Sequence, residues 1–561
     1  MNTRIEKLIA CPRDCYDTCR LVAVVENGKV VLIKPNNDPI TKGIGCPRGV
    51  KDSLRLYSSS RILYPVENIR KSGIYKRIDW DKALEIIVNK IHEVMEQYGP
   101  QTILFLDYAG NRGLINRHGS KRLWNYLRVA RIDYTKCDAA GDKALKLIYG
   151  TTYGVYPKDM DKLKVIVFWG FNPFSSSIHI WHKAMELRAR ECTIVVIDVR
   201  RSETVKYSDF LQPRPGSDGV LTLGISKYLI DNGKVDMEFI KKYVYGFNLF
   251  VKHVEKYSLE FVERVTNILR SEIVKLAELL CEKKPFAIFI GYGLQRGFGG
   301  GEIVRAIASI PALLGIHRGF YYSNTDGLPI NFSAIEGQDL GLPSRIISME
   351  KVGTYLARGE FKFVYIHLQN PAATLPNALK VIEGLKRNDV FVVVHDTHWS
   401  DSARLTNIVL PAPTYLEKLD VVYSYWHNYL YLNEPVIDPL GESLSEYQVM
   451  CELAKALKIS DFDKVCLDPI ELLKLGLGTE VLDMLLKYKV IELKPRPGGE
   501  YQTSSGRIEL YSLAAERECL PPLPSPPGGE TLHENEFLLI SSTHRLYTHT
   551  QFEDIYGPIP P

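Results

Sequence analysis

Two stretches of this chain show the same order of strand-like apolar runs and helical segments. In the first stretch, the apolar run 163–169 is followed by the turn Gly170-Phe-Asn-Pro173, a helical segment over 176–190 and a second apolar run over 193–199. Short, mostly apolar runs rich in β-branched residues are typical of strands buried on both faces of a parallel sheet. The pattern therefore predicts a β-α-β unit.

The same layout returns much later in the chain. The apolar run 362–367 is followed by Gln369-Asn370-Pro371, a helical segment over 375–386 and a strand over 390–394 that ends in His395-Asp396. In both units an Asp follows the Asn of the turn by 26 positions. The repeat predicts two similar crevices, for two similar ligands or for the two ends of one ligand.

Turns of this kind point to nucleotide binding. Backbone amides and a helix N-terminus can face a phosphate there, and an acid at the tip of the second strand can accept from a ribose hydroxyl or a guanine edge. The candidate binding residues of the two units are Trp169, Gly170, Asn172, Pro173 and Asp198, and Gln369, Asn370, Pro371 and Asp396. Glycine-rich turns add the candidates Pro215, Gly216, Asp218 and Gly291. Each such turn could equally be a helix cap or a tight connection, and neither unit has the G-x-G-x-x-G of an ordinary NAD site.

A cluster of cysteines near the N-terminus indicates a metal site. The clustered residues are Cys11, Cys15, Cys19 and Cys46. Between the third and the fourth, the apolar runs 21–25 and 29–33 flank Glu26-Asn27-Gly28, which predicts a hairpin with a type I′ turn. The spacing C-x3-C-x3-C-x26-C fits a [4Fe–4S] cluster better than the cysteine pairs of zinc ribbons. A zinc site with four cysteine ligands and a plain structural role remain alternatives.

Composition and charge bound the class of protein. The 561 residues, of which 45% are hydrophobic, are typical of a large soluble protein with several domains. A formal charge of +4 from 70 basic and 66 acidic residues does not favour nucleic acid or an anionic membrane as a partner. No apolar run reaches the roughly 18 residues of a membrane helix, and neither a twin arginine nor an apolar leader precedes Cys11. We therefore expect a cytoplasmic enzyme with no direct membrane span.

Several sequence motifs, taken together, resemble one family. They are CPRDCYDTC, GCPRG, RIDWDKAL, CDAAGDKALKLIYG, WGFNP, VIDVRRSET, PRPGSDG, NPAATLPN, LTNIVLPAPTYLEK, DPLGESLSEYQV and SSGRIELYS. The chain resembles the molybdopterin-guanine-dinucleotide oxidoreductases, the dimethyl sulfoxide reductase family, of the type with an N-terminal [4Fe–4S] domain. The resemblance implies a cluster on Cys11, Cys15, Cys19 and Cys46, and a bis(molybdopterin guanine dinucleotide) holding Mo or W.

The same resemblance implies roles for two further residues. Arg48, two positions after the last cluster cysteine, would bridge the cluster and one pterin; the alternative is a solvated arginine. The protein ligand to Mo or W would come from the segment 134–142, where Cys137 is the candidate because a soft thiolate suits these metals, with Asp138 as the competing ligand.

The fold implied by the resemblance is α/β with discontinuous domains. A β-rich [4Fe–4S] domain would comprise 1–55 with 426–520, and two Rossmann-like, doubly wound domains would comprise 56–136 plus 332–425 and 137–331. Residues 521–561 would be a proline-rich linker and the opening of a truncated C-terminal β-barrel cap, which a separate chain could complete.

The implied activity is a two-electron oxo-atom, sulfur-atom or related redox transfer on a small molecule. Electrons would pass through the cluster to or from an iron–sulfur protein or ferredoxin. Formate dehydrogenases of this family place a histidine after their metal ligand, where this chain has Asp138, so a polysulfide or thiosulfate reductase-like enzyme is favoured over a formate dehydrogenase-like one. A hydratase-like relative and a non-catalytic iron–sulfur scaffold subunit are further alternatives, and the intact WGFNP, PGSD and NPAATLPN loops favour an enzyme over the scaffold.

Overall fold

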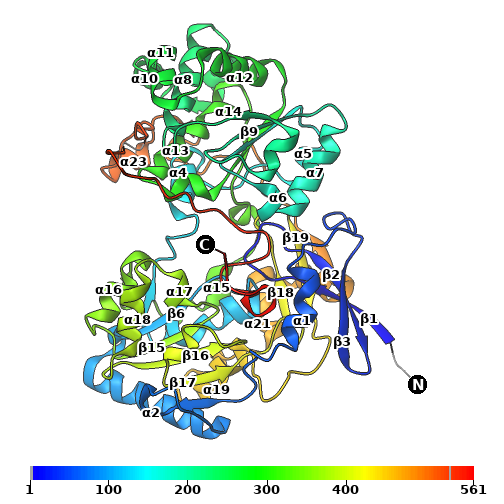
Figure 1. The fold of residues 1–561 in the computed structure, drawn as a ribbon, viewed down its shortest axis with the longest axis vertical. Coiled ribbons are helices and arrows are strands. Elements are labelled where there is room, and N and C mark those ends of the chain that lie inside the picture. Colours follow the sequence, from blue (N-terminus) through cyan, green and yellow to red (C-terminus); the bar gives the residue numbers. More distant parts are fainter. Residues whose placement is uncertain (1–3, 530–531, 561) are drawn as a thin grey trace.

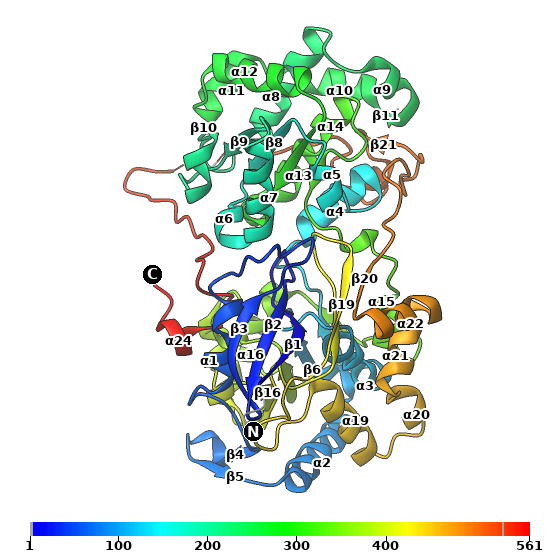
Figure 2. The same cartoon turned by 90° about the vertical axis from the view of Figure 1, so that its right-hand side faces the viewer.

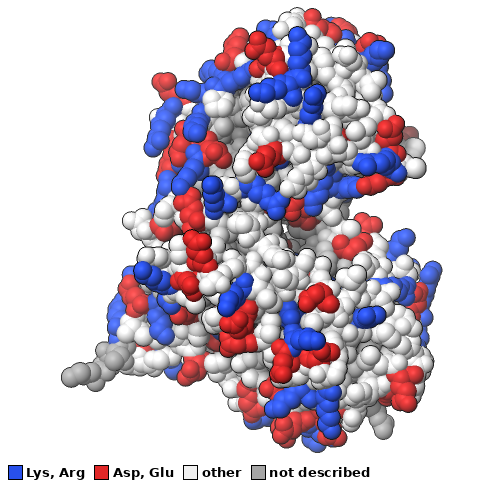
Figure 3. Space-filling model, turned by 180° about the vertical axis from the view of Figure 1, so that it is seen from behind, with Lys and Arg blue, Asp and Glu red and all other residues white. Residues whose placement is uncertain are grey.

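The chain folds into two stacked halves, each built around a parallel β-sheet. A computed structural model describes residues 4–529 and 532–560. The middle of the sequence forms the upper half in Figure 1, and its two flanks share the lower half. Side chains of both charge signs are interspersed over the face in Figure 3, and the outline of the molecule narrows where the halves meet. Within the described ranges, no helix is both long and apolar enough to cross a bilayer.

The upper half contains a sheet of five parallel strands. Their order is β10 (Asp209–Leu211), β9 (Thr193–Ile197), β8 (Val165–Trp169), β12 (Phe286–Ile290) and β13 (Phe320–Tyr321). The first predicted β-α-β unit is confirmed as β8, the helices α6 (Pro173–Ser176) and α7 (Ile178–Arg188), and β9.

The lower half contains a sheet of eight strands drawn from two distant parts of the chain. The order is β14 (Ile346–Ile347), β7 (Ala130–Ile132), β6 (Ile103–Asp107), β15 (Phe363–His367), β16 (Phe391–Asp396), β17 (Ile408–Pro411), β4 (Val66–Asn68) and β5 (Tyr75–Arg77). The first six strands run parallel, and β4 and β5 add antiparallel to the edge. The second predicted unit is confirmed as β15, the helices α17 (Pro371–Thr374) and α18 (Ala378–Lys386), and β16.

Alternation along the strands explains why helices cover both faces of the lower sheet. Phe105 and Phe363 point into one core, which also contains α2 (Trp80–Tyr98), whereas Leu104 and Val364 point into another core with α18. Since successive strand residues face opposite sides, a strand that is apolar throughout must be buried on both. The chain is therefore a mixed α/β protein with more than one parallel sheet.

The remaining helices pack around these sheets. In the lower half they are α1 (Asp52–Leu56), α3 (Lys121–Tyr126), α15 (Phe332–Glu336), α16 (Val352–Ala357), α19 (Glu446–Ala456), α20 (Phe462–Val465), α21 (Pro469–Leu477) and α22 (Thr479–Tyr488). In the upper half they are α4 (Ala139–Tyr149), α5 (Pro157–Met160), α8 (Asp218–Asp231), α9 (Met237–Tyr243), α10 (Phe247–Val254), α11 (Leu259–Thr266), α12 (Arg270–Glu282), α13 (Gly300–Ile307), α14 (Ser309–Leu313) and α23 (Leu513–Arg517).

Two antiparallel sheets lie beside the junction of the halves. The predicted hairpin is confirmed as β2 (Arg20–Glu26) and β3 (Lys29–Pro35), with positive φ at Asn27 and Gly28 as a type I′ turn requires. A strand that the sequence pattern did not predict, β1 (Arg4–Ala10), pairs with β2. The second sheet is β18 (Asp420–Val422), β19 (Tyr429–Asn433) and β20 (Val490–Glu492), and it lies next to the first sheet (Figure 2).

Residues 426–520 pack against three different parts of the molecule. The first strand of this stretch, β19, receives a hydrogen bond from Ala10 N at Asn433 Oδ1 (2.9 Å). The helices α19, α21 and α22 belong to the core of the lower sheet, and β21 (Ile508–Glu509) pairs with β11 (Val244–Tyr245) in the upper half. This stretch thus contacts the N-terminal sheet, the lower core and the upper half, and the domain boundaries stated above remain a prediction.

Residues 521–529 lie on the upper half, and residues 547–556 contact the N-terminal loops beside the lower half. The proline-rich part is bound to the upper half, since Arg305 donates to the carbonyls of Pro521 and Pro522 and His253 contacts that of Pro524. Between 532 and 560 the described residues form one short helix, α24 (Glu553–Tyr556), and no strand. Residues 1–3, 530–531 and 561, which fall within the first and last predicted domains, lie outside the described residues.

One buried ion pair joins distant segments of the lower half. Arg61 binds both carboxylate oxygens of Glu417, at 3.0 and 3.3 Å, and both side chains are almost fully buried. Glu417 also accepts from the backbone amides of Thr414 (2.6 Å) and Leu440 (2.8 Å). This carboxylate therefore satisfies several donors that would otherwise be buried without a partner.

Replacing Glu417 by Gln should destabilise the lower half strongly. The neutral amide leaves the Arg61 charge uncompensated and turns an NH2 group toward existing donors, a situation that typically costs about 3–5 kcal/mol. Scanning calorimetry of the purified protein should show a clearly lowered melting temperature for E417Q. Glu434, which pairs with Lys489 at the surface, is the matched control, and E434Q should change the stability by less than about 1 kcal/mol. Equal melting temperatures for the two variants would contradict the role given to Glu417.

Candidate active site

The four clustered cysteines are brought together by the N-terminal sheet. Cys11, Cys15 and Cys19 lie in the connection from β1 to β2, and Cys46 lies in the loop after β3. The amide of Cys11 donates to the carbonyl of Cys19 (2.9 Å), and the amide of Gly49 donates to the Cys46 thiol (3.3 Å). All four are free thiols. The hairpin therefore returns the chain so that Cys46 lies near the other three cysteines, as predicted.

The thiol groups fit a metal cluster on chemical grounds. Burial raises the pKa of Cys11, of Cys15 and of Cys19, and the nearby Cys46 adds to the rise in each case. Four thiolates packed this closely repel one another unless a cation compensates their charge. Iron–sulfur clusters are held by a set of four cysteine thiolates of this kind.

A histidine from the upper half contacts this group and was not predicted from the sequence. Nε2 of His179, at the start of α7, lies 3.0 Å from the Cys19 thiol. Asp17 accepts from the hydroxyl of Ser177 and lies beside the same thiol. His179 follows the Asn172-Pro173 turn closely, so its position just after the WGFNP motif is the signal that could have identified it.

Two arginines border the cysteines. Arg48 is buried beside the Cys46 thiol and donates to the Tyr547 carbonyl (3.0 Å), which excludes the alternative of a solvated arginine. Arg13 contacts the Cys11 thiol (3.4 Å) and forms a buried ion pair with Asp52. The Cys11 and Cys46 thiols therefore each have a guanidinium as a direct neighbour.

Cys137 lies at the junction of the halves, just before α4. Its carbonyl accepts from Gln295 Nε2 (2.6 Å), and the other end of the same amide accepts from the amide of Gly141 (2.7 Å). Burial raises the pKa of the Cys137 thiol, and Asp14 adds to the rise. Burial, together with Asp14, also raises the pKa of Asp138 to about 6.

The first set of predicted nucleotide residues meets at the carboxyl edge of the upper sheet. Trp169 Nε1 donates to Asp218 (2.8 Å), and burial raises the pKa of this carboxyl to about 6. Gly291 packs so closely that a side chain there would overlap the Gly170 carbonyl. Asp198 lies close enough to Asp218 to affect its pKa. Pro215 and Gly216 form the turn that leads into α8.

The two Asn-Pro turns share a hydrogen-bond arrangement that extends beyond the predicted repeat. The amide nitrogen of Asn172 donates to Glu203 (3.0 Å), and its oxygen accepts from the hydroxyl of Thr204 (2.6 Å). In the second unit Asn370 donates to Asp401 (3.0 Å) and accepts from the hydroxyl of Ser402 (2.7 Å). In both units the acid follows the Asn by 31 positions and the hydroxyl follows it by 32. An acid–hydroxyl pair at this fixed offset is a signal that the sequence analysis missed.

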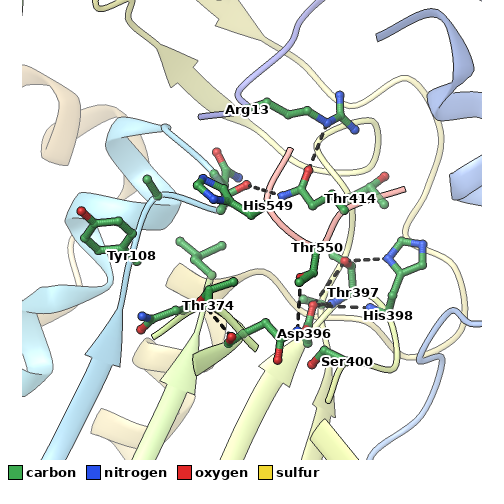
Figure 4. Close-up of a pocket in the computed structure, with 18 of the residues that line it drawn as sticks. Arg13, Tyr108, Thr374, Asp396, Thr397, His398, Ser400, Thr414, His549 and Thr550 are labelled. Atoms are coloured by element: carbon green, nitrogen blue, oxygen red, sulfur yellow. Dashed lines mark hydrogen bonds between the residues drawn. The ribbon is translucent and has the colours of Figure 1, made fainter. Parts of the chain in front are cut away.

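A cavity of about 520 Å³ opens at the second unit. The predicted residues that line it are Cys137, Gln369, Asn370 and Asp396. Figure 4 shows Asp396 and Thr397 beneath the segment that carries His549 and Thr550. Both polar atoms of the Gln369 side chain are buried without a partner among the described residues. An orphaned amide that lines a cavity of this size fits a ligand with polar edges, such as a nucleotide base.

The segment 547–556 forms the outer wall of this cavity. His549 contacts Asp14 (2.8 Å), and although burial acts in the opposite direction, this bond lowers the pKa of Asp14 to about 2. Gln551 accepts from Arg13 (3.1 Å), and Thr550 accepts from Asn370 (3.2 Å). Residues near the N-terminus and residues beyond 540 are thus joined around the same space.

A second, smaller cavity of about 170 Å³ shares Tyr108, Ala109 and Cys137 with the larger one. The structure therefore brings Cys137 together with Gln369, Asn370 and Asp396 around the larger cavity, and Arg13, which contacts the Cys11 thiol, lines the same cavity. The residues of the first unit lie at the other sheet and line neither of these two cavities. Two cysteines that the sequence analysis left unassigned, Cys451 and Cys466, form a disulfide.

The chain is similar to known proteins both in sequence and in fold. The probable oxidoreductase YoaE of Bacillus subtilis is 32% identical over 568 residues, covering 97% of this chain and 83% of that protein. A Staphylococcus aureus protein named "Putative formate dehydrogenase" is 24% identical over 494 residues, covering 81% of this chain and 49% of its own length. The structure of acetylene hydratase from Pelobacter acetylenicus superposes with a TM-score of 0.81 at 21% identity, covering 92% of this chain and 79% of that one, and shares its fold.

Two family models match consecutive parts of the chain. The model described as the molybdopterin oxidoreductase Fe4S4 domain matches residues 10–58, and the model described as molybdopterin oxidoreductase matches residues 55–456. An iron–sulfur cluster and a molybdopterin cofactor with Mo or W are therefore its cofactors. The chain belongs to the molybdopterin oxidoreductase family and is an oxidoreductase.

Proposed function

We propose that this oxidoreductase removes a sulfur atom from thiosulfate or a polysulfide. With thiosulfate, two electrons and one proton are taken up, the sulfur–sulfur bond breaks, and sulfite and hydrosulfide are released. The observation that carries the proposal is the residue next to the proposed metal ligand: Asp138 follows Cys137 where formate dehydrogenases of this family have a histidine. The electrons would come from an iron–sulfur protein or ferredoxin.

The assignment of metal ligands is part of the same proposal. Cys137 would hold the Mo or W, because this residue lines both cavities, and because the Gln295 amide binds the carbonyl of Cys137 at one end and the amide of Gly141 at the other. Cys11, Cys15, Cys19 and Cys46 would hold the cluster. When bound, the metal supplies the two-electron redox change and accepts or donates the transferred atom.

The polypeptide's own tasks are positioning and charge compensation. Arg48 is buried beside the Cys46 thiol, so we assign it to the boundary between the cluster and the pterin. Asp14, kept ionised by His549, faces Cys137 and fixes a negative charge near the reacting centre. Gln295 holds the start of α4, and so the position of Cys137, by bonds to two backbone groups.

The cofactor would contain two pterin guanine dinucleotides, one at each β-α-β unit. Support comes from the matched Asn-centred arrangement at the two turns and from the unpartnered Gln369 amide in the larger cavity. Trp169, Gly170, Asn172, Pro173, Asp198, Pro215, Gly216, Asp218 and Gly291 would serve one dinucleotide. Gln369, Asn370, Pro371 and Asp396 would serve the other.

Formate oxidation is the second candidate. It is favoured by the relative whose name describes a formate dehydrogenase, which matches 81% of this chain. The reaction would release two electrons, one proton and carbon dioxide from formate. It differs from the first candidate in the direction of electron flow, so the two are separable in one set of assays.

Purified, metal-loaded enzyme should form sulfite and hydrosulfide from thiosulfate when a reduced dye supplies electrons. C137A should lose this activity by at least about 100-fold, because the metal loses its protein ligand, while the visible absorption of the cluster persists. Formate with an oxidised dye is the parallel assay for the second candidate. Cys519 is exposed and outside the site, so C519A is the control and should keep full activity. Full activity in C137A would refute the ligand assignment, and inertness toward thiosulfate would refute the proposed reaction.

Replacing a cluster cysteine should lower the iron content of the protein and leave the protein ligand of the Mo or W in place. In C19S the hard hydroxyl replaces a thiolate ligand, so the protein should bind clearly less iron and lose the low-temperature electron paramagnetic resonance signal of the reduced cluster. Iron and acid-labile sulfide analysis provides the measurement, with C519S treated identically. An iron content in C19S equal to that of C519S would contradict the assignment.

Gln369→Ala should weaken dinucleotide retention with little effect on folding. Its side chain has no protein partner in the described structure, so truncation removes no internal hydrogen bond, whereas a bound ligand would lose its contacts. Guanine nucleotide released on denaturation should fall from two per metal in the wild type. Gln101, an exposed amide bound only to the Tyr98 carbonyl, is the control for the substitution. Unchanged nucleotide content in Q369A would exclude a dinucleotide at this position.

A further inference from the structure

The smaller cavity beside Cys137 differs in character from the larger one. None of its lining residues belongs to either β-α-β unit, whereas the larger cavity is lined by Gln369, Asn370 and Asp396. Its volume of about 170 Å³ lies below the roughly 300–1,000 Å³ of pockets for drug-sized ligands. The smaller cavity therefore suits a molecule of a few heavy atoms that reaches the Cys137 thiol.

One guanidinium that lines this cavity has no partner. Arg117 lies on the π-helical turn η4 (Leu114–Gly119), and such turns are frequent at functional sites. Among residues 4–529 and 532–560, no acceptor takes a hydrogen bond from its side chain and no carboxylate pairs with it. Its Nε is buried, so water does not satisfy that donor from outside. A buried donor of this kind is costly unless a ligand accepts from it.

The hydroxyl groups of the two tyrosines that line the cavity beside Arg117 already form hydrogen bonds with other residues. The hydroxyl of Tyr423 bonds His118 Nε2 (2.9 Å), and His118 Nδ1 bonds Glu336 (2.9 Å). The hydroxyl of Tyr425 donates to Asp14 (2.9 Å). These bonds fix the walls and leave the guanidinium with donors to spare.

Among the described residues, no acid of the cavity forms an ion pair with Arg117, although Asp138 lies close enough for the Arg117 charge to act against the rise in its pKa. Asp326 pairs with Lys146 (3.3 Å). Burial, together with Asp138, raises the pKa of Asp142, which favours the neutral carboxyl, and one of its oxygens is buried without a partner. A neutral carboxyl can donate to an oxygen atom. The free hydrogen-bonding groups thus match a small anion that carries at least two oxygens.

We propose that Arg117 binds the substrate in this smaller cavity, and that the substrate is a small oxyanion held by two guanidinium donors next to Cys137. The inference rests on the proposed function and narrows it, because thiosulfate and formate both present such oxygens whereas an uncharged polysulfur chain does not. A fork of two parallel donors is the arrangement in which arginine binds such groups most strongly. Arg117 then orients the anion.

The test measures anion binding directly, apart from turnover. Holoenzyme, R117M and R117K are compared at matched metal and iron content, with calorimetric titration of sodium thiosulfate and of sodium formate. R117M should bind the recognised anion about 10- to 100-fold more weakly, and R117K should fall between it and the wild type, because lysine keeps the charge but loses the fork. Arg358, whose side chain is 68% exposed, supplies the control R358M, which should bind both anions as the wild type does.

The outcomes separate this inference from the proposed function. Weakened thiosulfate binding in R117M supports both when the wild type also turns thiosulfate over. Weakened formate binding alone, with formate turnover in the wild type, supports the Arg117 site while moving the reaction to formate. Weakened binding of either anion without turnover in the wild type supports the site and refutes the reaction. Thiosulfate turnover in R117M with an unchanged KM refutes the site and leaves the reaction standing. If R117M binds too little metal, equal affinities of R117K and wild type for both anions overturn the inference.

Discussion

The parallel pairing of β6 with β15 is the constraint on which the rest of the structure depends. It places Ile103 opposite Phe363 and Asp107 opposite His367, although all five strands of the upper sheet lie between them in the sequence. The entropy lost in closing so long a loop grows only with the logarithm of its length, so the apolar contacts of the buried strands can compensate for it. The chain therefore leaves the lower sheet after β7 and comes back before β14. Cys137 lies at the point of departure, which is why it borders both cavities.

In each sheet, an acidic residue and a hydroxyl residue bind the Asn side chain of the Asn-Pro turn. A strand that ends in an Asn-Pro turn exposes backbone groups at the carboxyl edge, and the Asn side chain must be held to keep the turn shape. Glu203 and Thr204 hold Asn172, and Asp401 and Ser402 hold Asn370. The residues that hold each Asn come from the loop after the second strand, so each unit is closed by a contact that its strands and helix alone do not contain. This shared closure is stronger support for two equivalent sites than the spacing of the aspartates.

The order of apolar and polar residues predicted the local strands and helices well, because apolar residues in a short run mark positions that become buried. The two β-α-β units and the hairpin follow from apolar runs and from Asn27-Gly28, which need no knowledge of distant residues. The discontinuity of the lower sheet came only from the family resemblance, since nothing in the periodicity near Ile103 indicates that its neighbour is Phe363. The strand β1 escaped prediction because its exposed half is rich in charged residues. Arg117 escaped for a different reason: an arginine becomes informative only when the fold has removed its partners.

The contacts of segment 547–556 determine when the larger cavity can be completed during synthesis of the chain. Tyr547 accepts from Arg48, Gln551 accepts from Arg13, and Asp554 pairs with Arg55, so the outer wall of the larger cavity rests on the N-terminal loops. A ribosome releases this segment only after every strand of both sheets has emerged. The larger cavity consequently lacks its outer wall until synthesis has passed residue 547, long after both sheets have left the ribosome. The outer wall is thus built from the last part of the chain to be synthesised, held by side chains from the first.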